Sequence, residues 1–527
     1  MPGERSGAND LANTETDSSF GHRMLGANFP HSVDQTELLE THISWVILTG
    51  QWAYKLKKPI RLDFLDYSTL PLRKKFCDRE LLINRVWAEE IYKDVVPVFE
   101  CLGHLRVGTS DDKCREGEEL VDYAVRMHQF PQTALLAEQL KTGLITPEVI
   151  EPLGEEIAKL HLRIESVPYH ASLVRGGAID PAIENCDYLL SELSPFDPDH
   201  DRTRKLKQWT LEAIERLQPL MERRARNGSV KECHGDLHLR NILFLDGRFL
   251  PFDGVEFNEA FSQVEGLDEI AFLAMELSEH GYQPHARRLI NRYVETTGDY
   301  ESLLLLRYFL VYRAMVRAKV DMIRQMQCFR HESTDDKSSK PKLSVDGRRY
   351  LDYAEALLQK FSPELWITYG FSGSGKSTAS TKVIESRGYF RVRSDVQRKL
   401  IACRDPYEKT AANELPKLYN AEMTTLTYQR LWTIADQILQ SGFGAIVDAS
   451  FLRQDLREPF QELASQHGVP FRILVCEAST EELKMRLEHR GSDPSDADVS
   501  VLESQMQSAQ PPTDSETTFV VRPAEIE

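Results

Sequence analysis

A glycine-rich segment in the C-terminal third of the chain has the spacing that phosphate binding requires. Gly370-Phe-Ser-Gly-Ser-Gly-Lys-Ser377 fits the pattern G-x-x-x-x-G-K-[ST] at every fixed position, between an apolar run and a helical run. Glycines let backbone N–H groups turn toward phosphate oxygens, the lysine adds positive charge, and the serine hydroxyl can bind Mg²⁺. The sequence therefore predicts a nucleotide-binding loop. Its expected residues are Gly370, Ser372, Gly373, Ser374, Gly375, Lys376, Ser377 and Thr378.

Polar positions downstream of this loop are candidates for completing a phosphoryl-transfer site. Asp395 follows the next apolar run and could orient an acceptor hydroxyl, or it could only cap the helix that begins there. Asp448 ends a further apolar run and could join Ser377 in the metal shell, or it could be a turn residue. Arg486 and Arg490 are four residues apart on a helical stretch, so they share a face that could close over phosphate; a solvated charged face is the alternative for Arg486. We expect catalysis to involve Lys376, Asp395 and Arg490.

A second set of polar residues lies between positions 234 and 253. The segment His234-Gly-Asp236-Leu-His-Leu-Arg-Asn241 fits H-x-D-x-x-x-x-N, and Asp253 follows after a short pair of apolar runs. In kinase chemistry one aspartate takes the proton of the acceptor hydroxyl, while an asparagine and a second aspartate hold metal ions. We expect Asp236 to be catalytic and Asn241 and Asp253 to be metal ligands. The alternative is a set of turn and capping residues.

Upstream of this set, a lysine and a glutamate could complete a nucleotide site. Lys55 lies in an apolar strand-like run, and Lys57 is its rival because alternate strand residues share a face. Glu80, in the following helical stretch, is the expected partner of the lysine, ahead of Glu89 and Glu90. Lys55 and Glu80 are therefore expected to bind the nucleotide, although each could be a plain surface charge.

Two different series of elements must position these residues. In the N-terminal part we expect a strand-rich lobe with one helix, followed by helices, a short strand pair and further helices. In the C-terminal part, four buried strands alternate with helices, as in a parallel sheet. The expected N-terminal elements are strands at 43–48, 52–57, 95–99, 102–107 and 120–127, a helix at 72–93, helices over 133–222, strands at 242–245 and 248–252, and helices to about 330. The expected C-terminal elements are a helix at 348–361 and strands at 366–369, 388–392, 444–447 and 471–476.

The motifs resemble two known families. HGDLHLRN and FDGVEF, without a glycine-rich loop before Lys55, resemble the aminoglycoside phosphotransferase (choline-kinase-like) branch over about residues 30–330. GFSGSGKST, RSDVQRK, IVDASF and MRLEHRGSDPSDAD resemble the small P-loop kinases that group with gluconate kinase, the kinase part of polynucleotide kinase and zeta-toxin-like proteins. The order of the two modules resembles a bacterial family described as bifunctional phosphotransferase/ATP-binding proteins.

The resemblance implies a multidomain fold of α+β and α/β type, with ATP and Mg²⁺ as cofactors. A bilobal protein-kinase-like domain would be followed by a three-layer α/β/α P-loop kinase-like domain with a parallel sheet. It also implies that His234 ties the catalytic loop to the metal-binding segment, and that Arg313 and Arg317 are structural ion-pair residues. The expected parts are a disordered N-terminus (1–25), a kinase-like domain (26–330), a polar linker with a connecting helix (331–361), a P-loop domain (362–515) and a tail (516–527).

Composition limits the partners of the chain. The 527 residues include 64 Lys and Arg and 82 Asp and Glu, so the formal net charge is −18. The chain as a whole therefore does not resemble a binder of duplex nucleic acid. We see no membrane-spanning run and no signal peptide, and the eight scattered cysteines fit a reduced cytoplasm.

The expected function is ATP- and Mg²⁺-dependent transfer of phosphate, at two sites, to hydroxyls of small aminoglycoside- or sugar-like molecules. One alternative makes one domain a nucleotide-sensing regulator of the other. Another makes the C-terminal domain a nucleic-acid 5′-hydroxyl kinase, with Arg391, Arg393 and Arg398 as a local phosphate patch.

Overall fold

The computed structural model describes residues 20–62, 65–331, 342–359, 361–406, 408–410, 414–489 and 495–526. Its contacts divide the chain into two compact units that interleave in sequence. The first unit is Met1–Leu144, Ser166–Leu173 and Gly228–Val264, and the second is Ile145–Glu165, Val174–Asn227 and Glu265–Glu527. The helices after residue 265 therefore group with the C-terminal part. Residues 332–341 of the expected linker lie outside the described residues, and a domain boundary there stays a prediction.

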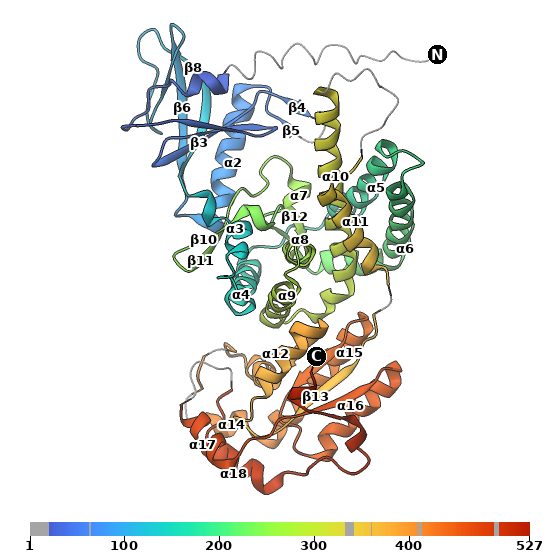
Figure 1. Cartoon of the computed structure of the whole chain (residues 1–527). Coiled ribbons are helices and arrows are strands. Elements are labelled where there is room, and N and C mark those ends of the chain that lie inside the picture. The colour runs from blue at the N-terminus through green and yellow to red at the C-terminus, as the bar shows by residue number, and fades with distance from the viewer. Residues whose placement is uncertain are drawn as a thin grey trace. The chain divides into compact units, whose positions relative to one another are not determined.

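The first unit contains a six-stranded antiparallel sheet, shown in blue and cyan in Figure 1. Strand residues alternate between two buried faces. Tyr54 and Leu56 face one core, whereas Ala53 faces the core against helix α2 (Leu70–Ala88). Alternation therefore places Lys55 and Lys57 on the α2 side. In spatial order the strands are β1 (Glu37–Glu40), β2 (Ser44–Leu48), β3 (Trp52–Lys57), β8 (Glu119–His128), β6 (Tyr92–Cys101) and β7 (His104–Val107).

Several boundaries in this unit differ from the sequence prediction. Helix α2 ends at Ala88 rather than 93, because β6 begins at Tyr92 and pairs along β8. Strand β1 was not expected, and residues 20–24 are helical, with Met24 fully buried in the sheet core. The shorter elements between residues 61 and 265 are β4 (Arg61–Leu62), β5 (Leu65–Asp66), η1 (Gln132–Ala134), α3 (Leu136–Lys141), β9 (Val230–Glu232), η3 (Leu239–Asn241), β10 (Ile242–Leu245), β11 (Arg248–Pro251), α7 (Glu259–Ser262) and β12 (Gln263–Glu265).

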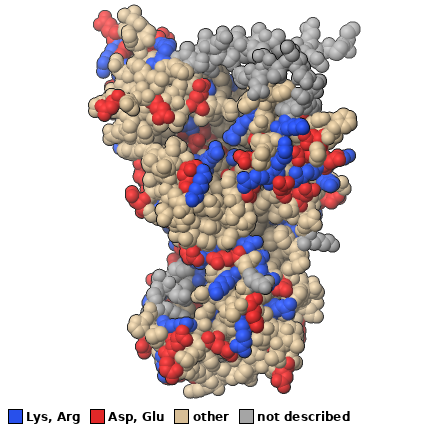
Figure 2. Space-filling model, in the orientation of Figure 1, with Lys and Arg blue, Asp and Glu red and all other residues tan. Residues whose placement is uncertain are grey.

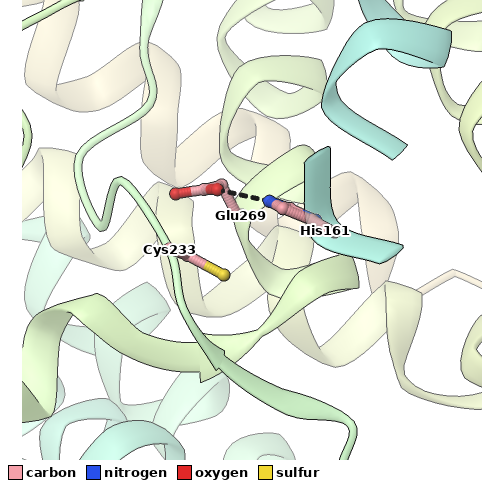
Figure 3. A group of neighbouring side chains, drawn as sticks. All are labelled: His161, Cys233 and Glu269. Atoms are coloured by element: carbon pink, nitrogen blue, oxygen red, sulfur yellow. Dashed lines mark hydrogen bonds and ion pairs between the residues drawn. The ribbon is translucent and has the colours of Figure 1, made fainter. Parts of the chain in front are cut away.

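The helical part of the second unit is held together by buried polar groups as well as apolar contacts. The ring of His161 lies 2.8 Å from Glu269 through Nε2 (Figure 3) and 3.0 Å from the Tyr293 hydroxyl through Nδ1. These bonds join three helices. Gly266, the first residue of α8, leaves room for the Tyr293 ring, since a Cβ there would lie 2.4 Å from the Tyr293 hydroxyl oxygen. The helices are α4 (Pro147–Arg163), the π-helix η2 (Arg175–Ile179), α5 (Asp180–Glu192), α6 (Pro198–Arg226), α8 (Gly266–Glu279), α9 (Gln283–Thr297), η4 (Tyr300–Ser302), α10 (Leu303–His331) and α11 (Val345–Leu357).

Helix α10 confirms the structural role expected for two arginines. Arg313 donates two hydrogen bonds to Asp268, of 2.7 and 2.8 Å, and Arg317 pairs with Glu276 at 2.8 Å. The guanidinium groups thus neutralise carboxylates of α8 inside the helical core. Within the part of the chain that the structure describes, no helix is both long and apolar enough to span a bilayer.

Charged side chains gather on the visible surface of this helical part. Figure 2 shows Lys and Arg among Asp and Glu over α5, α6 and α11. Arg202 of α6 bonds Glu355 of α11 at 2.9 Å and also pairs with Asp352. The basic groups on this face are therefore interspersed with acidic partners, which weakens their attraction for a polyanion.

The C-terminal part of the second unit contains a five-stranded parallel sheet. Its spatial order is β14 (Phe390–Arg393), β15 (Ala445–Asp448), β13 (Leu365–Tyr369), β16 (Phe471–Val475) and β17 (Val520–Val521). Right-handed crossovers place α12 (Lys376–Arg387) on one face, and α15 (Ala421–Gln440) and α16 (Gln454–His467) on the other. Contacts between α15 and α16 agree with this arrangement. The domain is the α/β/α type expected from the sequence.

The sheet includes one strand from the expected tail. β17 pairs with β16, and the buried Glu516 accepts hydrogen bonds of 2.7 and 2.8 Å from the fully buried Arg457 of α16. Residues 516–526 therefore pack as part of the domain. The other elements are α13 (Ser394–Ile401), α14 (Leu415–Leu418), α17 (Thr480–Glu488), α18 (Val499–Ser508), η5 (Thr517–Phe519) and η6 (Pro523–Glu525).

Candidate active sites

In the first unit, both candidate lysines bind the same glutamate. Lys55 Nζ donates to Glu80 Oε1 at 2.8 Å, and Lys57 Nζ donates to Glu80 Oε2 at 2.6 Å. Each lysine then has a second carboxylate partner: Asp253 for Lys55 and Glu256 for Lys57. The expected Lys55–Glu80 pair is therefore present, and Lys55 is the lysine that reaches the predicted metal ligand.

The electrostatics of this cluster keep Lys55 and Glu80 charged. Burial alone would lower the pKa of Lys55, but the carboxylates of Asp253 and Glu80 raise it well above its usual range. Burial would likewise raise the pKa of Glu80, whereas Lys55 and Lys57 lower it to about 2. A buried ammonium pre-positioned by carboxylates is suited to contact phosphate oxygens.

Lys57 is more deeply buried than Lys55. Its side chain is 1% exposed, against 11% for Lys55. Its second partner, Glu256, also accepts a 2.6 Å hydrogen bond from the hydroxyl of Tyr67. Glu256 was missed as a site residue in the sequence, although it stands three positions after Asp253 within the FDGVEF segment. Glu90, one of the rival glutamates, instead pairs with Arg248 at 2.7 Å.

Paired substitutions at the two lysines distinguish their roles. We expect Lys57→Met to lower the free energy of unfolding by about 3–5 kcal/mol, because it removes the ammonium that pairs directly with the buried Glu256. Lys55→Met should cost less stability, since Lys57 still pairs with Glu80, but should weaken nucleotide binding. Urea unfolding and calorimetric titration with an ATP analogue measure the two effects. A Lys57 variant of unchanged stability that no longer binds nucleotide would reverse the assignment.

The predicted catalytic loop brings Asp236 and Asn241 together. The Asn241 amide nitrogen donates to the Asp236 carbonyl oxygen at 3.0 Å and to its carboxylate at 3.1 Å. His238 Nε2 lies 3.4 Å from the same carboxylate, and the Asp236 side chain is 42% exposed. Asp236 thus keeps an accessible carboxylate on an anchored loop, as a general base requires.

Asp253 is fixed by its backbone. Its φ of +62° is a left-handed conformation that is uncommon for a residue other than glycine. The Asp253 N–H donates to the Tyr92 hydroxyl at 3.0 Å, and His234 Nε2 lies 2.8 Å from the carbonyl oxygen of Phe252. The latter contact is the link that the resemblance implied for His234. Strained backbone held by such contacts is typical of functional sites.

The second site is a cavity of about 1140 Å³ at the carboxyl ends of the parallel strands. Strand β13 leads into the phosphate loop, β14 into Asp395, β15 ends at Asp448, and β16 leads into Glu477. These ends lie at one edge of the sheet, beside the point where the strand order reverses around β13, which is where α/β sheets bind ligands. The structure thus brings the predicted C-terminal site residues that it describes to one cavity or its immediate loop.

The loop conformation explains its glycines. Gly370, Gly373 and Gly375 have φ values of +153°, +84° and +90°. A Cβ on Gly370 would lie 2.4 Å from the Cys476 carbonyl oxygen, so this position admits no side chain without movement. Ser372, Ser374, Ser377 and Thr378 line the cavity together with Gly373 and Gly375. Lys376 Nζ donates to the carbonyl oxygens of Gly370 at 3.0 Å and Phe371 at 2.8 Å, which holds its charge against the loop.

The oxygen groups of this cavity fit a magnesium ion. The Ser377 hydroxyl and the Asp448 carboxylate both line it, and hard oxygen donors are what Mg²⁺ prefers. Asp448 is 5% exposed, and its Oδ2 accepts a 3.2 Å hydrogen bond from Ser380 of α12. That bond orients the carboxylate beside the N-terminus of α12.

Asp395 lies in the first turn of α13, but the N-cap of that helix is Arg393. Asp395 therefore does not cap the helix, as the alternative interpretation of the sequence had suggested. Its carboxylate accepts a 3.3 Å hydrogen bond from the Tyr419 hydroxyl and lines the cavity. The position suits an acceptor-facing carboxylate, and the contact with Tyr419 was not predicted from the sequence.

The arginines around the cavity have different surroundings. Arg486 donates to the Gly373 carbonyl oxygen at 3.1 Å and pairs with Glu482, so it contacts the phosphate loop. Arg490 lies outside the described residues. The three arginines of the expected phosphate patch bind groups of the chain itself: Arg391 bonds Thr381 at 3.0 Å, Arg393 pairs with Glu295, and Arg398 bonds the Leu418 carbonyl oxygen at 3.2 Å.

One loop contact escaped sequence reasoning. The Gln505 side chain on α18 accepts a 2.9 Å hydrogen bond from the Ser372 N–H and donates to the Ser372 hydroxyl at 3.1 Å. The two residues are 133 positions apart. A glutamine in an ordinary helical stretch carries no local signal for such a contact.

Comparisons with known proteins agree with the C-terminal motif. Residues 365–512 match the AAA domain family. Over 469 residues the chain is 26% identical to the uncharacterized protein Rv2004c of Mycobacterium tuberculosis, covering 88% of each chain, and a Mycobacterium bovis protein matches equally.

Similar solved structures fall into two groups. A choline/ethanolamine kinase family protein from Mesorhizobium loti is 14% identical, with 65% of this chain and 95% of that one covered and a TM-score of 0.38. A gluconokinase from Sinorhizobium meliloti is 22% identical, with 32% and 89% covered and a TM-score of 0.21. A sugar kinase from Janibacter is 19% identical, with 31% and 86% covered and a TM-score of 0.24.

Proposed function

We propose that the chain is an ATP- and Mg²⁺-dependent phosphotransferase with two nucleotide sites, each acting on a hydroxyl of a small molecule. The observation that supports this most strongly is that two separate places each gather a lysine, an accessible aspartate and oxygen ligands for a metal. Lys55, Asp236 and Asp253 provide them in the first unit. Lys376, Asp395 and Asp448 provide them in the second.

The residues have distinct tasks in this proposal. At the N-terminal site, Lys55 binds nucleotide phosphate and Asp236 accepts the proton of the attacking hydroxyl, while Asn241 and Asp253 hold Mg²⁺. At the C-terminal site, the loop N–H groups, Lys376 and Arg486 surround the phosphates, Asp395 orients the acceptor, and Ser377 and Asp448 hold Mg²⁺. Bound Mg²⁺ would neutralise charge on the phosphate oxygens. Positioning and charge neutralisation supply most of the catalysis in such chemistry.

The acceptor is proposed as an aminoglycoside- or sugar-like molecule. A cavity of about 1140 Å³ has room for nucleotide and a second small molecule. Tyr419 and Tyr428 line it beside Asp395 and offer flat aromatic surface next to a carboxylate. Since Arg391, Arg393 and Arg398 bind groups within the chain, the observations favour a small acceptor over a nucleic-acid end.

Nucleotide stoichiometry tests the proposal. We expect isothermal titration of the full chain with a non-hydrolysable ATP analogue and Mg²⁺ to show two nucleotides per chain. Lys55→Met and Lys376→Ala should each remove one of them. A single binding event that only one of these substitutions removes would contradict a two-site enzyme. A screen of hydroxylated metabolites for ATP-dependent phosphorylation would then identify the acceptors.

A further inference from the structure

The outer edge of strand β14 is covered by side chains from the helical part of the second unit. β14 is the first strand in the sheet, with β15 on its inner side. On its outer side, the Arg391 N–H donates to Asn291 Oδ1 at 2.8 Å, and Asn291 Nδ2 donates to the Tyr389 carbonyl oxygen at 3.1 Å. The Tyr300 hydroxyl donates to the Arg391 carbonyl oxygen at 3.1 Å. Side chains of α9 and η4 thus take the place of a neighbouring strand.

One helical turn after Asn291, the same helix holds the end of β14 by an ion pair. Glu295 accepts a 2.6 Å hydrogen bond from Arg393 Nε, and Nη2 of Arg393 binds its other oxygen. The side chain of Glu295 is 3% exposed and that of Arg393 is 12% exposed. Burial would raise the pKa of Glu295, but Arg393 and Arg391 lower it to about 2, so the pair stays ionised. Two parallel hydrogen bonds fix the orientation of the guanidinium as well as its distance.

Arg393 is next to the residues that begin the acceptor side of the cavity. Arg393, Ser394 and Asp395 all line it, and α13 starts at Ser394. In the sheet register, Arg393 lies opposite Asp448 of β15. A displacement of Arg393 would therefore be transmitted along two peptide bonds to Asp395, and across one strand pair to the predicted metal ligand.

We infer that Glu295 is a positioning residue of the C-terminal site, which acts through Arg393 to fix where Asp395 meets the acceptor. The inference rests on the proposed function of that site. Asn291 and Tyr300 also hold the backbone of β14. Helix α9 therefore contributes to the C-terminal site, although it precedes the polar segment 332–341 in sequence. Phosphoryl transfer at this site then depends on helices that the sequence assigns to the other domain.

Turnover in the full chain tests this role. In an Asp236→Asn background, which silences the N-terminal site, we expect Glu295→Gln to lower phosphate release from Mg²⁺–ATP by about 10- to 100-fold, as misplacement by about 1 Å can do. The affinity for a non-hydrolysable ATP analogue should change less than about twofold, since Glu295 is not among the residues that line the cavity. Hydrogen exchange of residues 389–401 should rise. Glu295→Asp, which keeps the charge but shortens the side chain, should show a smaller loss of turnover.

A control carboxylate contacts the same helix, α9, at another place. Glu385 of α12 accepts a 3.1 Å hydrogen bond from Arg288 of α9, away from the end of β14, so Glu385→Gln should leave turnover within about twofold of the parent. Glu295→Gln should also add little once Asp395 is already Asn. If turnover is unchanged in both Glu295→Gln and Glu295→Asp, the inference is wrong while the proposed function stands. The same holds if Glu295→Gln lowers turnover as much in the Asp395→Asn variant as it does with Asp395 intact. Absence of any Lys376-dependent turnover in the parent would overturn the proposed function and this inference with it.

Discussion

Replacing Asp236 by asparagine is expected to lower phosphoryl transfer at the N-terminal site by about 10²–10⁴-fold, the usual span for loss of a general base. Asparagine has the same shape but cannot take the proton of the acceptor hydroxyl. The fold should survive, because the side chain is 42% exposed and Asn241 still bonds the backbone carbonyl of residue 236. Nucleotide affinity should stay near that of the parent, since Lys55, Glu80 and Asp253 are untouched.

The measurement needs an acceptor found by the metabolite screen and a P-loop site silenced by Lys376→Ala. Initial rates then report the N-terminal site alone. Asp246→Asn is the matched control, because Asp246 is an exposed residue of the neighbouring β10–β11 turn and carries the same charge change. If transfer proceeds at the parental rate without the Asp236 carboxylate, that loop does not supply the base.

The short motifs of both candidate sites could be recognised in the sequence. A G-x-x-x-x-G-K-S run and an H-x-D-x-x-x-x-N run each span eight residues, so their geometry is largely set by short-range backbone constraints. The four main strands of the parallel sheet were predicted within about two residues, because buried parallel strands are continuous apolar runs. Strand β17 was missed because two residues carry no periodicity.

The different surroundings of Lys55 and Lys57 could not be predicted from the sequence. Alternation along a strand puts both side chains on one face and offers nothing to rank them. What separates them is their second partner: Asp253 or Glu256, which are 198 and 199 positions away in sequence. The two side chains also differ in burial: that of Lys55 is partly accessible to solvent, whereas that of Lys57 is enclosed.

The grouping of the helices was also beyond sequence reasoning. Composition marks a polar segment at 331–347, and that is a sound signal for a linker. Side chains such as Asn291 and Glu295 decide which elements pack together. In the sequence these two are ordinary polar residues of an amphipathic helix. Their contacts with β14 are about 100 positions apart in the chain, so only the folded structure brings them together.

Lys376→Ala is expected to have the largest effect at the C-terminal site. A hydrogen bond to a charged group contributes about 1.5–3 kcal/mol, so nucleotide affinity there should fall by about 10- to 150-fold. Turnover should fall further, because the ammonium also stabilises charge that develops on the transferred phosphate, an effect worth about 10²–10³-fold for comparable groups. The loop itself should persist, since its shape depends on the positive φ values of Gly370, Gly373 and Gly375.

Titration with a fluorescent ATP analogue measures the loss of affinity at the C-terminal site, with Lys55→Met present to remove the N-terminal signal. Lys484→Ala is the matched control, because Lys484 lies on α17 outside the cavity lining and is 44% exposed. In the chain with Lys55 intact, nucleotide binding to the first unit should be unaltered by Lys376→Ala, since the cluster of Lys55, Glu80 and Asp253 contains no residue of the P-loop domain. Loss of both binding events from the single substitution would show that the two sites are energetically coupled and would favour a regulatory role for one of them.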